Sequence, residues 1–207
     1  GCGDSYFAAV SVKPIFDKYL APLKIKTVVM QAIEVSRYYQ FEEDENTLVV
    51  VVTASGSAAR LVEVLKRAHK YNVPSLVITN KPESVAAKEA RYILYTNTPD
   101  FPKGSPGLRS YLASTLGLEL LVMSLSQTLT DKNTSIINQF EEELMAYTEK
   151  IKEVLPGIDQ KARGIAERWN KLKSFEVVVD APYFAIGKFV AAKYAEVSGD
   201  MCTVIDS

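Results

Sequence analysis

A run of small hydroxyl residues around a glycine is the segment of this chain best suited to bind an anion. The run is Val52-Thr53-Ala54-Ser55-Gly56-Ser57, between a β-branched stretch and an amphipathic one. This position predicts a helix start, where backbone N–H groups lack partners and the helix dipole favours negative charge. Small side chains let a phosphate group approach the backbone closely. Alternatively, Ser55 or Ser57 simply caps the helix, and the residues alone leave both interpretations open.

A second turn of similar design lies at the start of the chain. Gly1-Cys2-Gly3 permits a tight turn, and Asp4 and Ser5 lead into a helical pattern. If both turns follow neighbouring parallel strands, they face one crevice at the carboxyl edge of the sheet. The presence of two such turns at one edge of the sheet favours a shared binding site over two unrelated helix caps.

The elements that would position these turns alternate between strands and helices. Residues 48–52 form a continuous β-branched run, typical of a strand buried on both faces of a parallel sheet. Residues 57–71 carry apolar side chains at helical spacing. Further strands are predicted at 27–30, 75–79 and 92–95, and further helices at 5–20, 32–39 and 107–129. The order predicts an α/β fold with a parallel sheet and helices on both faces.

The composition changes after residue 130. Two charged amphipathic helices are predicted at 135–154 and 158–172, separated by Pro156-Gly157. A strand, a helix and a strand follow, at 175–179, 183–197 and 202–205. Two strands do not make a stable sheet by themselves. We therefore expect a first unit over 1–130 that lacks its first strand, a helical linker over 131–173, and an incomplete second unit over 174–207.

Composition narrows the classes of partner. Lys and Arg number 24 and Asp and Glu 25, and this balance gives no electrostatic reason to expect nucleic acid or an anionic membrane. No uninterrupted apolar run approaches the ~20 residues of a membrane span. Cys2 and Cys202 form no disulfide framework, so we expect a cytoplasmic protein. Because His, Cys, Asp and Glu show no metal-ligand spacing, we expect neither a metal nor a cofactor.

Three segments, in this order, resemble the motifs of the sugar isomerase (SIS) domain family. They are Gly1-Cys2-Gly3-Asp4-Ser5-Tyr6, Glu34-Val35-Ser36-Arg37-Tyr38 and Thr53-Ala54-Ser55-Gly56-Ser57. The resemblance covers nearly the whole chain. It is greatest to the branch that includes the isomerase half of glucosamine-6-phosphate synthase, phosphosugar isomerases, amino-sugar phosphate deaminases and fructosamine phosphate deglycases. It implies a flavodoxin-like three-layer fold in tandem units, a hexose or amino-hexose 6-phosphate ligand, and a homodimer.

The resemblance also implies which residues bind the sugar phosphate. Ser5, Thr53 and Ser55 match hydroxyl positions of the family's site. Ser105 lies in the segment that closes over the sugar, where Arg109 matches a lysine. The expected binding residues are Asp4, Ser5, Thr53, Ala54, Ser55, Gly56, Ser57 and Ser105.

Several of these positions depart from the family pattern. Asp4 replaces a threonine, and Ala54 stands where the synthase has a glutamine. Ala58 replaces the last threonine of the phosphate loop, which removes one hydroxyl that Ser57 could supply instead.

The expected catalytic residue is Glu196, which matches the family's glutamate in a Lys-Glu-Ile-Ser stretch. Interconverting an aldose and a ketose moves a proton between adjacent carbons, and one carboxylate can take and return it. Alternatively, Glu196 is an ordinary exposed helix carboxylate. The family's Gly-Glu-x-x-His-Gly-Pro segment, whose histidine helps open the sugar ring, does not follow Glu196 here. His69 is expected to be solvated.

Two classes of function follow from these residues. The first is an enzyme that isomerises, deaminates or deglycates a sugar phosphate through an enediol-type proton transfer. The second is a non-catalytic phosphosugar sensor. In either case the helix at 107–129 carries more apolar residues than one face needs, which indicates a second surface that a second unit or another copy of the chain would cover.

Overall fold

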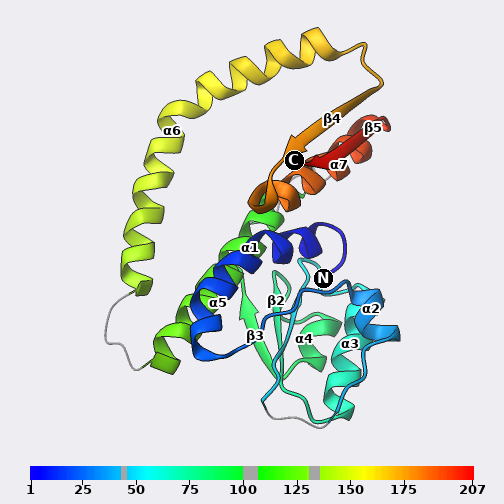
Figure 1. Cartoon of the computed structure of the whole chain (residues 1–207), viewed down its shortest axis with the longest axis vertical. Helices are drawn as coiled ribbons and strands as arrows, with labels where there is room; N and C mark the ends of the chain where they lie inside the picture. The colour runs from blue at the N-terminus through cyan, green and yellow to red at the C-terminus, as the bar shows by residue number, and fades with distance from the viewer. Residues whose placement is uncertain (43–45, 100–106, 131–135) are drawn as a thin grey trace.

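Two parallel sheets form the framework of the chain in the computed structural model, which describes residues 1–42, 46–99, 107–130 and 136–207 (Figure 1). The first sheet has the order β1-β2-β3 and the second pairs β4 with β5. The elements are α1 (Asp4–Leu20), η1 (Ala21–Leu23), α2 (Ala32–Arg37), β1 (Val49–Val52), α3 (Ala59–Lys70), β2 (Ser75–Thr79), α4 (Val85–Glu89), β3 (Tyr92–Tyr95), α5 (Leu108–Thr130), α6 (Ile136–Trp169), β4 (Ser174–Val179), η2 (Ala181–Tyr183), α7 (Phe184–Ser198) and β5 (Met201–Asp206). The predicted α/β architecture with parallel strands is confirmed.

Helices cover both faces of the first sheet, which makes a three-layer structure. On one face, Val51 and Val77 pack against Leu61 and Leu65 of α3. On the other face, Val12 of α1 and two leucines of α5 pack on the sheet through Val52 and Ile78. This burial on both sides explains the continuous apolar run of β1 and β2, because neither face of the strands meets water.

The second sheet has a different environment. Side chains of β4 and β5 alternate between half-buried and exposed positions along each strand. α7 packs on one face, where Gly187 lies close to Val179 and Val204. The opposite face carries exposed apolar side chains, including Val178 and Met201. A strand that is covered on one side shows this period of two.

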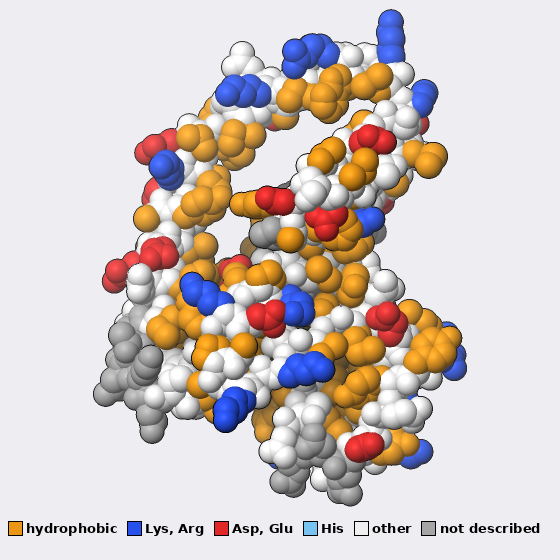
Figure 2. Space-filling model, viewed as in Figure 1, with side chains coloured by type: hydrophobic (Ala, Val, Ile, Leu, Met, Phe, Trp, Pro, Cys, Tyr) orange, Lys and Arg blue, Asp and Glu red, His pale blue; other side chains and the backbone are white. Residues whose placement is uncertain are grey.

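α6 connects the two sheets as a single helix of 34 residues (Figure 1). The prediction of two helices separated by Pro156-Gly157 is therefore wrong. Pro156 lies inside the helix. Figure 1 shows the helix following a curved path, and the space-filling view in Figure 2 shows an open gap between this helix and the rest of the molecule. A proline removes one helical hydrogen bond and bends the helix, and because no residue of α6 is buried, the bend disturbs no packing.

Two other local predictions differ from the structure. Residues 27–30 are not a strand, and Val28 there is 60% exposed. The short helix α4 was not predicted; it begins after Ser84, whose side chain accepts a hydrogen bond from the backbone N–H of Ala87. The positions of β2 and β3 match the predicted ranges in full.

α5 has the length and hydropathy of a helix that could cross a membrane, by composition alone. In the structure it packs as a core helix. Ser114, Leu118 and Val122 are buried, and the helix lies between α1 and β2. Leu108, Leu112 and Leu129 remain exposed, so part of its surface is apolar and uncovered.

Candidate functional site

The loop that joins β1 to α3 has a fixed shape. Gly56 has a φ of 64°, and a Cβ atom added there would lie 1.9 Å from the Ser84 Oγ. The backbone N–H of Gly56 donates to Thr53 Oγ1 at 3.2 Å. The backbone N–H of Ala86 donates to the Gly56 carbonyl, which ties the loop to α4. Only glycine fits this position, because a side chain would be strained in its backbone conformation and would collide with α4.

No side chain caps the N-terminus of α3. Its N-cap residue is Ala58, which makes no side-chain capping bond. Ser55 and Ser57 instead place their Oγ atoms 2.9 Å apart, on the loop before the helix. The capping interpretation of these two serines is therefore wrong. Among the described residues, no side chain accepts from the first backbone N–H groups of α3, and this is the arrangement that binds anions at helix starts.

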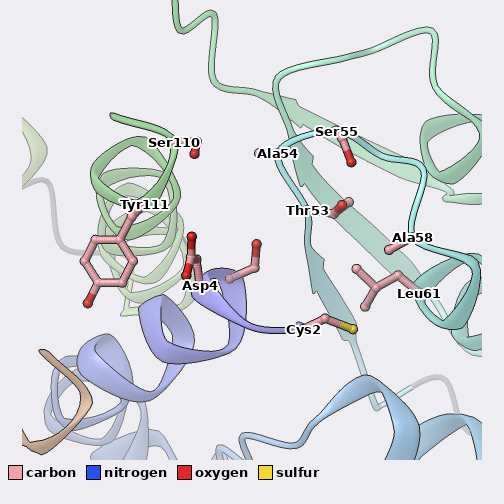
Figure 3. A pocket seen from close by; sticks show the side chains of 10 residues that line it. Cys2, Asp4, Thr53, Ala54, Ser55, Ala58, Leu61, Ser110 and Tyr111 are labelled. Atoms are coloured by element: carbon pink, nitrogen blue, oxygen red, sulfur yellow. The ribbon is translucent and has the colours of Figure 1, made fainter. Parts of the chain in front are cut away.

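A pocket of about 270 Å³ lies between this loop and the N-terminus of α1 (Figure 3). In Figure 3 the loop before α3 forms one side of the pocket, the first turn of α1 faces it, and the start of α5 forms a third side. Its lining residues are Cys2, Asp4, Ser5, Thr53, Ala54, Ser55, Ala58, Leu61, Ser110 and Tyr111. The volume is close to the lower end of the range for small-molecule sites.

Two of the helix N-termini at this pocket, those of α1 and α3, differ in charge. Asp4 lies in the first turn of α1, so its own carboxylate is near the positive end of that helix dipole. α3 has no acidic residue in its first turn. An anion entering the pocket is therefore attracted to the α3 side, which offers N–H groups and hydroxyls without a competing carboxylate.

Lys193 of α7 links Asp4 to Glu196. Its Nζ lies 2.7 Å from Asp4 Oδ2, and it also contacts the Glu196 carboxylate one helical turn along α7. The Lys193 side chain is 14% exposed. Burial by itself lowers the pKa of this lysine, but the hydrogen bonds and charges of Asp4 and Glu196 outweigh burial and raise it. Lys193 is therefore a fully charged bridge between the pocket and α7 near neutral pH.

An aromatic stack also holds α7 against the pocket. The rings of Tyr111 and Phe189 lie 3.9 Å apart at their centroids, with an interplanar angle of 19°. Both residues are buried, together with Ala8 of α1. Because Tyr111 also lines the pocket, one wall of the site depends on how α7 docks.

The structure brings together five of the residues predicted from sequence. Asp4, Ser5, Thr53, Ala54 and Ser55 line the pocket. Gly56 and Ser57 shape its loop but do not line it. Glu196 has a 58% exposed side chain and is linked to the pocket through Lys193. Ser105 lies outside the described residues.

Sequence reasoning did not identify Lys193, Ser110 or Tyr111. The spacing of Lys193 three residues before Glu196 on a helix was a usable signal, because such pairs face the same side. Ser110 and Tyr111 gave no local signal, since their place in the pocket comes from the packing of α5 beside α1.

No metal site is evident in the part of the chain that the structure describes. The described residues hold no group of three metal-ligating side chains. A hollow of about 520 Å³ runs along α6, but Lys161, Gly164, Ile165 and Arg168 of that one helix are its whole lining. Walls from a single exposed helix do not enclose a ligand, so the pocket beside α1 is the better candidate.

Comparisons with known proteins agree with this fold. A family model described as SIS domain matches residues 1–124. The glutamine–fructose-6-phosphate aminotransferase of Thermococcus kodakarensis is 29% identical over 176 residues, which is 84% of this chain and 28% of that protein. The chain thus spans less than a third of that relative's length.

Solved structures show the same fold at low identity. The C-terminal domain of glucosamine-fructose-6-phosphate aminotransferase from Francisella tularensis has a TM-score of 0.86 and 22% identity, covering 99% of this chain and 56% of that one. Glucosamine-6-phosphate deaminase from Thermotoga maritima has a TM-score of 0.72 and 20% identity, covering 100% of this chain and 59% of that one.

Proposed function

The chain belongs to the SIS domain family, and from that premise we propose that it binds a phosphorylated sugar in the pocket between α1 and α3. The observation that carries this proposal is the uncapped N-terminus of α3. Its preceding loop presents Ser55 without using that side chain as a helix cap. N–H groups, hydroxyls and the positive end of the helix dipole all favour a phosphate there.

Replacing Ser55 with alanine tests this assignment. The change removes a hydroxyl aimed at the phosphate, and a hydrogen bond to a charged group contributes ~1.5–3 kcal/mol. Affinity for hexose 6-phosphates, measured by calorimetry, should fall by about tenfold or more. Ser198→Ala, which changes an exposed serine at the end of α7, is the matched control and should bind as the wild type does. Equal binding of phosphorylated and plain sugar by the wild type would contradict the proposal.

The proposal extends to proton transfer by Glu196, through an isomerase, deaminase or deglycase reaction. The supporting observation is that Glu196 shares Lys193 with Asp4, a pocket residue. Glu196→Gln keeps the shape but removes the basic carboxylate, so exchange of substrate carbon-bound hydrogen with deuterated water should slow by roughly 10²–10⁴-fold. Binding should change little. Tight binding by the wild type with no exchange for any tested sugar would favour a phosphosugar sensor instead.

We further propose a cytoplasmic homodimer. The exposed leucines of α5, at positions 108, 112 and 129, are the supporting observation for self-association. Light scattering at micromolar concentration should give twice the chain mass, and a stable monomer would contradict the dimer.

A further inference from the structure

The carboxylate of Asp4 is an unexpected group in a pocket proposed to bind an anionic ligand. It lies in the first turn of α1 and lines the pocket, and in Figure 3 its carboxylate points towards the start of α5, beside Tyr111. Its side chain is 31% exposed, so the neighbouring residues cover it only in part. Lys193 contacts Oδ2, whereas Oδ1 accepts no hydrogen bond from the described residues. Asp4 therefore has an acceptor to offer a ligand.

The side-chain charges around Asp4 do not cancel. Asp4 and Glu196 share the single ammonium of Lys193, so the three side chains together carry one net negative charge. Lys193 is largely buried and held between its two partners, and it cannot neutralise both of them. The α1 side of the pocket thus attracts a cation, while the α3 side attracts an anion.

A ligand that satisfies both sides carries a phosphate at one end and a positive charge towards the other. A carboxylate accepts a hydrogen bond from a neutral hydroxyl, but its bond to an ammonium is charge-assisted and roughly twice as strong. Burial in a partly enclosed pocket strengthens this difference, because water screens the charges less.

We propose that Asp4 is a specificity-determining residue, which selects phosphorylated sugars bearing a protonated amine over those bearing a hydroxyl at the same carbon. This inference rests on the proposed sugar-phosphate site. It assigns the two walls of that site different tasks: the loop before α3 holds the phosphate, and the first turn of α1 distinguishes the substituent.

Calorimetric binding of three sugars tests the proposal: glucosamine 6-phosphate, glucose 6-phosphate and N-acetylglucosamine 6-phosphate. The wild type should bind the first at least about tenfold more tightly than the second. The acetylated sugar keeps the nitrogen but loses the charge, so it should lose the preference as well. In Asp4→Asn the preference should fall to within about threefold, because the amide keeps the shape without the charge.

Two further variants test whether the amine preference depends on the charge of Asp4 itself or on any loss of charge from α1. Asp17→Asn makes the same change at the other end of α1, beside Lys13, and should keep the wild-type preference. Asp4→Thr provides a second neutral side chain, for use if the asparagine variant does not fold as judged by circular dichroism.

The outcomes distinguish this inference from the proposed function. An unchanged amine preference in both Asp4 variants, or no preference in the wild type, would overturn the role of Asp4 while the sugar-phosphate site stands. A wild type that binds none of the three sugars would overturn the site itself, and the inference with it.

Discussion

The two parallel sheets are built from similar β-branched sequences and differ in what covers them. In the first sheet, Val51, Val77 and Ile78 are almost fully buried between α3 on one face and α1 with α5 on the other. In the second sheet, α7 covers one face, and Val178 on the opposite face is 63% exposed. Apolar strand residues therefore stabilise the two regions unequally, and the second region depends on its contact with the first.

A matched pair of isoleucines gives the strongest test of this difference. Ile78 in β2 is 1% exposed and Ile205 in β5 is 40% exposed. Ile78→Ala should lower the free energy of unfolding by about 2–5 kcal/mol, because it removes buried methyl groups and leaves a cavity. Ile205→Ala should lower it by less than about 1 kcal/mol. Urea unfolding followed by circular dichroism gives both values, and similar losses would mean that the sheets are equally buried in solution.

The next largest effect is expected from weakening the contact between the two regions. Phe189→Leu keeps an apolar side chain but removes the ring stacked on Tyr111, a geometry that contributes about 0.5–1.5 kcal/mol beyond its buried area. Amide hydrogen exchange should speed up in α7, β4 and β5 while β1 and β2 stay protected. Val190→Ala, at a 43% exposed position of the same helix, should leave exchange unchanged. Faster exchange throughout both sheets would show that they unfold as one unit.

The smallest effect on stability is expected from a carboxyl group in α5, which covers one face of the first sheet. Burial raises the pKa of Glu119 in α5. An acid whose folded pKa lies above its unfolded value favours folding while protonated, and loses that advantage as pH rises through the two pKa values. Glu119→Gln cannot ionise, so it should be more stable than the wild type at neutral pH and equally stable in acid.

The exposed Glu176 of β4 provides the control for this measurement. Glu176→Gln should change the stability by no more than about 0.5 kcal/mol at either pH. Thermal unfolding at neutral and acidic pH compares the two variants. A larger shift from Glu176 than from Glu119 would contradict the assignment of burial to the first region.

The sequence predicts most of the elements because their signals are local. β2 and β3 appear at their predicted positions, since each is a short β-branched or aromatic run between turn residues. The same kind of run at 27–30 is not a strand, because a strand also needs a partner, which no local pattern reports. Pro156 and Gly157 predict a break that α6 does not have, since an exposed helix tolerates a bend.

In the candidate site, too, the features with a local sequence signal were predictable and those that depend on tertiary packing were not. The loop before α3 was predictable because a helix start carries its own chemistry in consecutive residues. The contribution of Lys193 was not, because it depends on α7 packing against α1, about 190 residues away in sequence. The sequence shows that Asp4 carries a negative charge. The net charge around it follows only from the structure, in which Asp4 and Glu196 share one lysine.

The long helix α6 has a consequence for how firmly α7 must hold the pocket. At 1.5 Å per residue, its 34 residues extend for roughly 51 Å along the helix path, and the chain then returns to α1. Docking of α7 is therefore an intramolecular event, with an effective concentration set by a semi-rigid connector rather than by free diffusion. Under that condition one aromatic stack and one ion pair suffice to keep the wall in place, whereas two separate chains would need a far larger interface.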